Sequence, residues 1–151
     1  MKKRNEFFGV VIAIMMGSGI ISGPVFGSGY SDAELEYYTD MLAHLIVGEV
    51  EGSDRQMKEY VGSVVLNRAQ SASFPESIEG VIFQEGQYSC TWDGNYNKTP
   101  SEEDFEIARD LLVNGSKLPE DVVFQAEFEQ GSGTYISLTA PNGVTEYFCY
   151  G

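Results

Sequence analysis

The sequence predicts an α+β domain in which a helical lobe is followed by a small antiparallel β-sheet. In segments between Ser31 and Asn114, apolar residues recur every three or four positions, which is the period of an α-helix with one buried face. After Pro119 the period changes to two, which is typical of a strand with one buried face. Because the helices come first and the strands last, the sheet is expected to pack against the helices.

The first helix is expected to begin at Ser31 and to stop at Gly52. Ser31 and Glu34 match a capping box, in which two side chains satisfy free amides at a helix start. Glu49 continues the apolar stripe, so its carboxylate should face the core side, whereas Glu51 should point to roughly the opposite side. The stripe itself consists of Leu35, Tyr38, Leu42, Leu45 and Ile46.

The second helix should follow almost at once. Ser53 and Gln56 match another capping box, and the helical pattern continues to about Ser71. Gly62 lowers helix stability, which indicates a close contact with another element at that position. The residues expected to face inward are Met57, Val61, Val64 and Val65.

Two more helices are expected before the sheet. A short one spans residues 77–84, and residues 86–98 form a loop rich in Gly, Asn and aromatic residues. The next helix has Thr99 as its cap and Pro100 at its first position, and it ends at Gly115. Its expected inward residues are Phe105, Ala108, Leu111 and Leu112.

Three strands complete the domain. The first alternates over residues 122–129, the second spans 135–139 and the third spans 144–150. Turn residues separate them at 131–133 and 141–143. Three successive strands with short turns predict an antiparallel sheet.

The composition is that of an ordinary globular domain with an acidic balance. The 151 residues are enough for one domain, and 42% of them are hydrophobic while 21% are charged. The net charge is −14, so nucleic acid is excluded as a partner, because its binding depends on neutralising phosphates with cations. No set of zinc ligands is present, which disfavours an amidase.

Residues 1–27 have the features of an export signal. The start, MKKR, is basic, residues 7–21 are apolar, and Gly23 and Pro24 close the run. This pattern predicts a secretory signal peptide. The alternative is an uncleaved N-terminal membrane anchor, because the apolar run approaches the length that spans a bilayer. In either case residues 28–151 are expected to be exported as a single domain, secreted or at the cell wall.

Glu49 is the candidate catalytic residue. A carboxyl group beside apolar neighbours has its neutral form favoured, because burial penalises the charge. A glutamate that holds a proton near neutral pH can act as the general acid that glycosidic bond cleavage requires. The alternative is a solvated residue near a helix end, which is the usual position of a glutamate there.

Four segments together resemble a known family. They are GEVEG at 48–52, VVLNRAQS at 64–71, FPESIEGVI at 74–82 and GQYSCTWDG at 86–94. Their order and spacing are similar to those of the cell wall hydrolases of the SleB type, the spore cortex-lytic enzymes. The resemblance extends from about residue 42 to the end of the sequence.

The resemblance implies both a function and a fold. The family cuts the glycan strands of peptidoglycan between N-acetylmuramic acid and N-acetylglucosamine as lytic transglycosylases, with a lysozyme-like catalytic lobe. Its essential glutamate, in the motif G-E-A-x-G, matches Glu49, with Val50 in place of the usual alanine. Glu146 stands where related sequences often have histidine. Spore cortex and vegetative wall are both open as substrates.

Three functions remain open: two catalytic mechanisms and one role in binding alone. A lytic transglycosylase needs one glutamate, which first protonates the leaving oxygen and then helps the sugar's own 6-hydroxyl attack. A hydrolytic muramidase needs a second carboxylate about 5–9 Å from the first, such as Asp93 or Glu127. The third alternative is a non-catalytic module that binds peptidoglycan through the aromatic loop.

A glycan-binding groove is expected beside Glu49, because aromatic rings stack on sugars and amides bind hydroxyl groups. Trp92, the only tryptophan, either contributes to this groove or fills the core. The candidate substrate-binding residues are Gln87, Tyr88, Ser89, Trp92, Asp93, Phe124, Gln125 and Tyr147.

Cys90 and Cys149 are the only cysteines, and both follow the export signal. An oxidising compartment favours a disulfide between them, which would join the last strand to the aromatic loop. The alternative is a pair of reduced, buried thiols.

Three other features have simpler explanations than catalysis. His44, the only histidine, is expected to be a packed or surface helix residue, and Arg68 an ion-pair partner of one of the acids. Residues 93–97 have the D-x-N-x-N spacing of a calcium loop, but Lys98 stands where that loop needs glycine, so an Asn-rich turn is expected. No metal or cofactor is expected, and the protein is expected to be a monomer.

Overall fold

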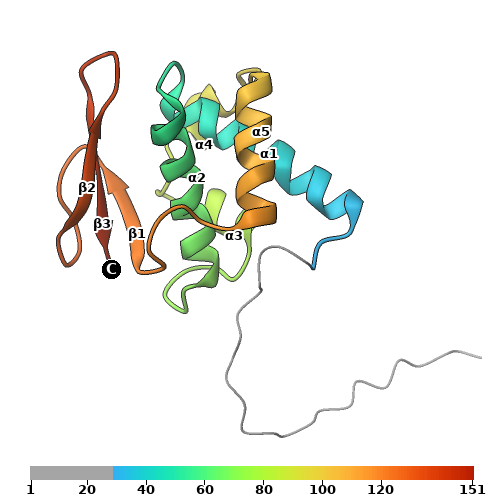
Figure 1. The fold of residues 1–151 in the computed structure, drawn as a ribbon, viewed down its shortest axis with the longest axis horizontal. Helices are drawn as coiled ribbons and strands as arrows, with labels where there is room; N and C mark the ends of the chain where they lie inside the picture. The colour runs from blue at the N-terminus through green and yellow to red at the C-terminus, as the bar shows by residue number, and fades with distance from the viewer. Residues whose placement is uncertain (1–28) are drawn as a thin grey trace, which may run out of the picture.

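Residues 29–151 are described by the computed structural model, and the expected signal peptide or membrane anchor at residues 1–27 lies outside them. Within this part of the chain, five α-helices and one 3-10 helix precede a three-stranded antiparallel sheet, which confirms the predicted α+β order. Figure 1 shows the sheet standing beside α2, on the side of the helical lobe opposite to the start of α1. None of the helices over residues 29–151 is long and apolar enough to cross a membrane.

Helix α1 spans Asp32–Val50 and contacts all four of the other α-helices. Its start is the predicted capping box: the Ser31 hydroxyl accepts the Glu34 amide at 3.3 Å, and the Glu34 carboxylate accepts the Ser31 amide at 2.8 Å. The predicted stripe is confirmed, and burial along it increases toward the C-terminal end of the helix. Leu35 and Tyr38 are partly buried, whereas Leu42, Leu45 and Ile46 are fully buried.

Helix α2 spans Arg55–Gln70 and begins one residue later than predicted. Asp54 caps it instead of Ser53, because the Asp54 carboxylate accepts the Met57 amide at 2.9 Å. Both residue types are good N-caps, so the pattern alone did not separate them. The predicted inward residues are confirmed: Met57, Val61, Val64 and Val65 are buried.

Helix α5 spans Glu102–Asn114 and begins two residues later than predicted. Ser101 caps it instead of Thr99, and its hydroxyl accepts the amide of the third helical residue at 3.2 Å. The inward face changes accordingly: Phe105, which was expected inside, is 36% exposed, and Ile107 is fully buried. The other predicted inward residues, Ala108, Leu111 and Leu112, are buried.

Gly62 lies where α2 packs against α5. A Cβ at this position would come within 2.5 Å of Leu111 Cδ1 and 3.4 Å of Ile46 Cδ1. Real Cβ atoms do not tolerate the shorter of these distances, so glycine allows the helices to approach. The close contact predicted at Gly62 is confirmed.

The segment between α2 and α5 is more regular than predicted. The short helix α3, Ile78–Ile82, is confirmed, but residues 86–98 are not only a loop. They contain the one-turn helix α4, Cys90–Asp93, and the 3-10 turn η1, Asn95–Asn97. Gly94, with φ of 94°, adopts the left-handed conformation that joins these two turns.

All three predicted strands are present. They are β1 (Val122–Ala126), β2 (Thr134–Thr139) and β3 (Thr145–Tyr150), in the order β1-β3-β2, so β3 is central. Strand β1 is shorter than predicted, and its pairing with β3 is irregular between Val122 and Phe124.

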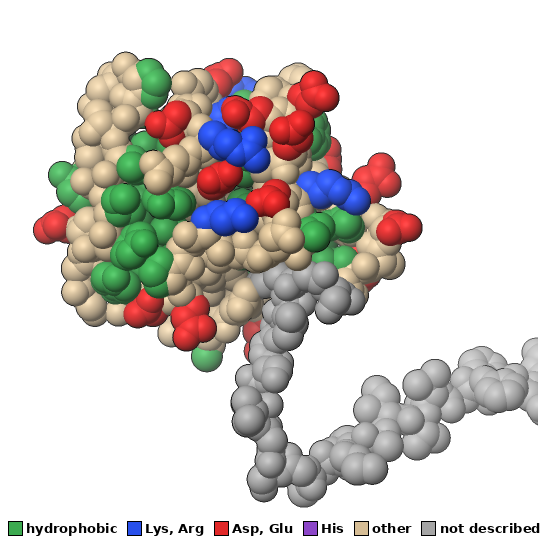
Figure 2. Space-filling view, viewed as in Figure 1, with side chains coloured by type: hydrophobic (Ala, Val, Ile, Leu, Met, Phe, Trp, Pro, Cys, Tyr) green, Lys and Arg blue, Asp and Glu red, His purple; other side chains and the backbone are tan. Residues whose placement is uncertain are grey.

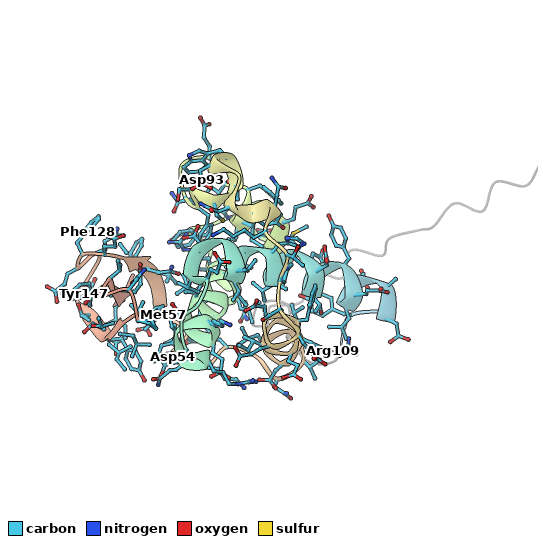
Figure 3. The ribbon with its side chains drawn as sticks, turned by 90° about the horizontal axis from the view of Figure 1, so that it is seen from above. Asp54, Met57, Asp93, Arg109, Phe128 and Tyr147 are labelled. Carbon is cyan, nitrogen blue, oxygen red and sulfur yellow. The ribbon has the colours of Figure 1, made fainter. Side chains whose placement is uncertain are left out.

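The two faces of β3 have different surroundings. Phe148 is fully buried and packs edge-on against the ring of Tyr60 on α2, with centroids 5.4 Å apart, so its face of the sheet is turned to the helices. Because strand side chains alternate, Glu146 shares this face and Tyr147 lies on the opposite one. Figure 3 shows Tyr147 on the side of the sheet away from α1.

Candidate active site

Glu49 lies in the last turn of α1 and is half-buried, and it interacts electrostatically with Glu146 on β3. Its carboxylate accepts a hydrogen bond from the backbone amide of Cys90 at 3.3 Å, at the start of α4. The other glutamate of the motif, Glu51, is exposed and pairs with Lys98 at 2.6 Å. The two carboxylates therefore lie in different surroundings, as the helical pattern predicts.

Gly48 is the reason that α4 reaches Glu49. A Cβ on Gly48 would lie 2.9 Å from Cys90 Cβ and 3.1 Å from Cys90 Sγ. Any larger residue would separate α4 from α1 and lengthen the hydrogen bond to Glu49. The glycine before Glu49 in the sequence is the signal for this contact, which sequence reasoning missed.

Cys90 and Tyr88 form the helical side of the site. Burial, together with a hydrogen bond to Glu49 and its charge, raises the pKa of the Cys90 thiol, so the thiol stays protonated. Burial raises the pKa of Tyr88 to about 12, with the Arg68 charge opposing the shift and the Glu49 charge adding to it. The Tyr88 hydroxyl is buried and has no hydrogen-bond partner within residues 29–151.

Two further glutamates lie on the sheet side. Burial raises the pKa of the Glu146 carboxyl, and the charges of Glu127 and Glu49 raise it further. Glu127 follows β1, and Glu146 lies on the face of β3 that is turned to the helices. The site is therefore a group of three carboxyls, of which Glu146 holds its proton to a higher pH than an ordinary glutamate. The alternation of side chains along β3 was the sequence signal that could have placed Glu146 on the same face as Phe148.

The structure places the predicted groove residues on both faces of the sheet and on the loop that precedes α4. Gln125 pairs with Phe148, so it shares the face turned to the helices, and its amide oxygen is buried without a partner in the described chain. Tyr147 lies on the other face of β3, away from Phe148 and Glu146, and its role in substrate binding stays a prediction. Gln87 and Ser89 are exposed on the loop.

Trp92 does not fill the core, because 60% of its side chain is exposed. Asp93, one of the two acids considered as a second carboxylate, is exposed, and its Oδ1 accepts the Asn95 amide at 2.8 Å. Figure 3 shows Asp93 on α4, well apart from the sheet residues. The expected Asn-rich turn is confirmed, and residues 29–151 contain no group of His, Cys, Asp and Glu that could hold a metal ion.

Arg68 is not the ion-pair partner that was expected. Its Nε donates to the Val123 carbonyl at 2.7 Å and its guanidinium also donates to the Gln87 amide oxygen at 3.2 Å. The guanidinium lies over the rings of Phe74 and Tyr88, 5.0 and 5.3 Å from their centroids. Arg68 thus connects α2, β1 and the aromatic loop, because a planar cation both donates and stacks.

The expected disulfide is not formed: Cys90 and Cys149 are free, buried thiols. Cys90 packs against Gly48 on α1, whereas Cys149 lies in β3, where its sulfur is 3.5 Å from the Gln130 amide and 3.6 Å from the Thr134 hydroxyl. The two sulfurs therefore occupy separate packing environments. His44 is a packed helix residue, as expected, with Nδ1 2.8 Å from the Tyr96 carbonyl oxygen.

Comparison with known proteins identifies the class of protein. The sequence model of the cell wall hydrolase family matches residues 52–136, more than half of the 151 residues. The chain therefore belongs to the cell wall hydrolase family.

Curated relatives with similar sequences are spore cortex-lytic enzymes. The protein from Bacillus cereus is 35% identical over 75 residues, which are 50% of this chain and 27% of the relative. The protein from Bacillus subtilis strain 168 is 29% identical over 96 residues, which are 64% of this chain and 30% of the relative. The chain thus matches less than a third of the length of these relatives.

Two solved structures have the same fold. The catalytic domain of the germination-specific lytic transglycosylase SleB from Bacillus anthracis has a TM-score of 0.60 and 24% identity, covering 81% of this chain and 98% of that one. The catalytic domain of Bacillus cereus SleB has a TM-score of 0.62 and 24% identity, covering 88% and 99%. The predicted helical lobe with a small sheet is therefore the fold of these catalytic domains.

Proposed function

We propose that this chain is an exported lytic transglycosylase that cleaves the glycan strands of peptidoglycan with Glu49 as general acid and base. The observation that carries the proposal is the position of Glu49, half-buried at the end of α1 and held by the Cys90 amide. Membership of the cell wall hydrolase family supports the substrate class.

The chemistry needs one proton carrier. Glu49 gives its proton to the oxygen of the bond between muramic acid and glucosamine as the bond from that oxygen to the muramic anomeric carbon breaks. The resulting carboxylate, stabilised by the Cys90 amide, takes the proton of the muramic 6-hydroxyl as its oxygen bonds to the same carbon. Glu49 is thereby protonated again, a 1,6-anhydro ring forms and no water is consumed.

A hydrolytic muramidase is the second candidate, and one observation favours it. Glu146 and Glu127 provide carboxyls on the sheet side that interact electrostatically with one another, and Glu146 also with Glu49. A second carboxylate opposite the general acid is what a hydrolase uses to activate water or to attack the sugar. The products distinguish the two mechanisms.

The test is mass spectrometry of soluble fragments released from purified spore cortex and from vegetative wall by the wild type and Glu49→Gln. Anhydro-muropeptides from the wild type alone support the transglycosylase. Reducing-end muropeptides overturn it in favour of the hydrolase. Binding by both proteins with release by neither indicates a non-catalytic peptidoglycan-binding module.

The location and assembly state belong to the same proposal. Residues 1–27 act as a signal peptide or membrane anchor, residues 28–151 form one catalytic domain outside the membrane, and the domain acts as a monomer. N-terminal sequencing of the exported protein and its sedimentation in solution test these two points.

A further inference from the structure

Arg68 is a buried cation that forms no salt bridge. It lies in the last turn of α2 and is 5% exposed. Figure 2 shows the surface lysine and arginine side chains of one face lying beside carboxylates, but within residues 29–151 no salt bridge includes Arg68. Burial of a charge is costly unless other groups compensate for it. An apolar side chain would fill the same space without this cost, so packing alone does not explain an arginine here.

The contacts of Arg68 join the sheet to the loop that precedes α4. On the sheet side, its Nε donates to the Val123 carbonyl of β1 at 2.7 Å. On the loop side, its Nη1 donates to the Gln87 amide oxygen at 3.2 Å, and the guanidinium lies 5.3 Å from the centroid of the Tyr88 ring. A planar guanidinium donates in two directions and stacks on a ring at once, which a lysine ammonium does not. Arg68 therefore holds this part of the loop to the start of β1.

The segment that Arg68 holds leads directly into α4. The Tyr88 carbonyl accepts the Thr91 amide at 3.1 Å and the Thr91 hydroxyl at 2.8 Å. The next carbonyl, that of Ser89, accepts the Trp92 amide at 3.1 Å. Because α4 is a single turn whose N-cap makes no side-chain hydrogen bond, these carbonyls fix how it leaves the loop. A contact that holds Tyr88 therefore also holds the start of α4.

The start of α4 is the group that binds the proposed catalytic residue. Cys90 is the first residue of α4, and its amide donates to the Glu49 carboxylate at 3.3 Å. This distance is just beyond the usual range of about 2.7–3.2 Å, so a small retreat of α4 breaks the bond. Gly48 allows α4 to come this close. The charges of Arg68 and Glu49 both act on the Tyr88 hydroxyl, which places these three side chains in one neighbourhood.

We propose that Arg68 is a positioning residue for the reaction: it holds the loop at Gln87 and Tyr88, and through the loop it holds the Cys90 amide against the Glu49 carboxylate. The inference rests on the proposed function and adds a residue that acts through others. Orientation of a reacting group contributes a large part of the rate. Loss of Arg68 is therefore expected to lower kcat and to leave KM nearly unchanged, because the orientation of Glu49 matters in the transition state.

Nuclear magnetic resonance of the Cys90 amide tests this contact without any substrate. The resonance of an amide that donates to a carboxylate moves when the carboxylate takes up a proton. Glu49→Gln is expected to abolish this movement, which separates it from the titration of Glu146 nearby. Arg68→Lys is expected to lose most of it, because a lysine cannot hold strand and loop together. A Cys90 titration in Arg68→Lys that equals that of the wild type overturns the proposal.

The reverse exchange, Lys58→Arg, is the matched control. Lys58 is the other buried cation of α2, and it pairs with Glu103 and Asp104 on α5, so it has no contact with the loop. The Cys90 titration should persist in this variant even if its stability changes. Loss of the titration in both Lys58→Arg and Arg68→Lys would show a general effect of disturbing α2 and overturns the proposal.

A milder pair of variants keeps the test valid if Arg68→Lys does not fold. Gln87 is exposed, and Gln87→Ala removes the hydrogen bond by which Arg68 holds the loop. The Cys90 titration is expected to weaken in this variant and to stay unchanged in Gln56→Ala, which removes an exposed glutamine at the start of α2. A full titration in folded Gln87→Ala then overturns the proposal.

Steady-state kinetics on soluble glycan strands measure the consequence for the reaction. Arg68→Lys is expected to lower kcat about 10–100-fold. A raised KM with unchanged kcat overturns the proposal, because it would make Arg68 a substrate-binding residue. If the Cys90 titration depends on Arg68 but the wild type releases no fragments from any wall, the proposed enzymatic function fails while the contact stands. Normal cleavage with a Cys90 titration that is independent of Arg68 gives the reverse result.

Discussion

The backbone amide of Cys90 donates to the Glu49 carboxylate across 3.3 Å, and the absence of a side chain on Gly48 is what allows it. The contact joins the end of α1 to the start of α4, two elements forty-one positions apart in the chain. It holds the carboxylate of the proposed acid against the start of α4, and orientation of the reacting group is a large part of catalysis.

Replacement of Gly48 by alanine tests this contact. The new Cβ would lie 2.9 Å from Cys90 Cβ, so α4 must move away from Glu49. We expect at least a tenfold loss of wall-cleaving rate and a loss of about 1–3 kcal/mol in the free energy of unfolding, as is usual for overpacking. Turnover and urea unfolding measure the two effects. Gly29→Ala is the control, because no atom lies within 4 Å of a Cβ at that site; equal behaviour of the two variants contradicts the argument.

The paired variants Glu49→Gln and Glu51→Gln separate catalysis from charge. Each replaces one carboxyl group by an amide of similar size at the same end of α1. Glu49→Gln is expected to lower turnover about 10²–10⁴-fold, the contribution of a general acid and base. Glu51→Gln loses only an exposed pair with Lys98, so it should keep its turnover and change stability by less than about 1 kcal/mol. Comparable losses in both variants would remove Glu49 from the proposed role.

The raised pKa of Glu146 predicts how stability depends on pH. Burial and the charges of Glu127 and Glu49 raise this pKa above its ordinary value of 4.5, so the folded chain binds the proton more tightly than the unfolded chain. The free energy of unfolding therefore decreases as the pH rises from the unfolded pKa through the folded one. Below this window the carboxyl is protonated in both states and imposes no cost.

The variant Glu146→Gln removes this dependence. It is expected to unfold at a higher temperature than wild type at pH 8 and at nearly the same temperature at pH 3. Thermal unfolding followed by circular dichroism at both pH values measures the difference. A variant that is less stable than wild type at pH 8 would show that the Glu146 carboxylate makes a favourable contact instead.

The free, buried state of the two cysteines predicts how they react with a thiol reagent. Because both thiols are free and buried, the folded protein should react with a thiol reagent slowly, and the protein unfolded without reductant should react at two sites per chain. Mass spectrometry after alkylation counts these sites. Addition of a reductant should leave the unfolding temperature unchanged. Failure to label the unfolded chain would mean that Cys90 and Cys149 are oxidised in the protein as prepared.

The local pattern of apolar and capping residues was enough to predict the order of the helices and strands and the face of α1 that carries Glu49. The capping box of Ser31 and Glu34 acts within four residues, so its effect is readable from the sequence. The starts of α2 and α5 were missed by one and two residues because neighbouring residues, Asp54 and Ser101, are equally good caps.

The arrangement of the sheet residues in the candidate site could not be predicted without the tertiary structure. Strand pairing decides that Glu146 and Gln125 share the face of Phe148 and that Tyr147 does not, because a shift of one residue would reverse every side chain. Packing likewise decides that Arg68 bonds a carbonyl and an amide instead of an acid, and that the two thiols stay apart.

The sequence by itself therefore determined the class of fold, the family motifs and the helix face that presents Glu49, since these follow from short-range periodicity and capping. Only the tertiary structure decided which groups surround Glu49: the Cys90 amide, which donates to it, and Glu146, with which it interacts electrostatically. These contacts join segments far apart in the chain, and their formation depends on how α1, α4 and β3 pack together.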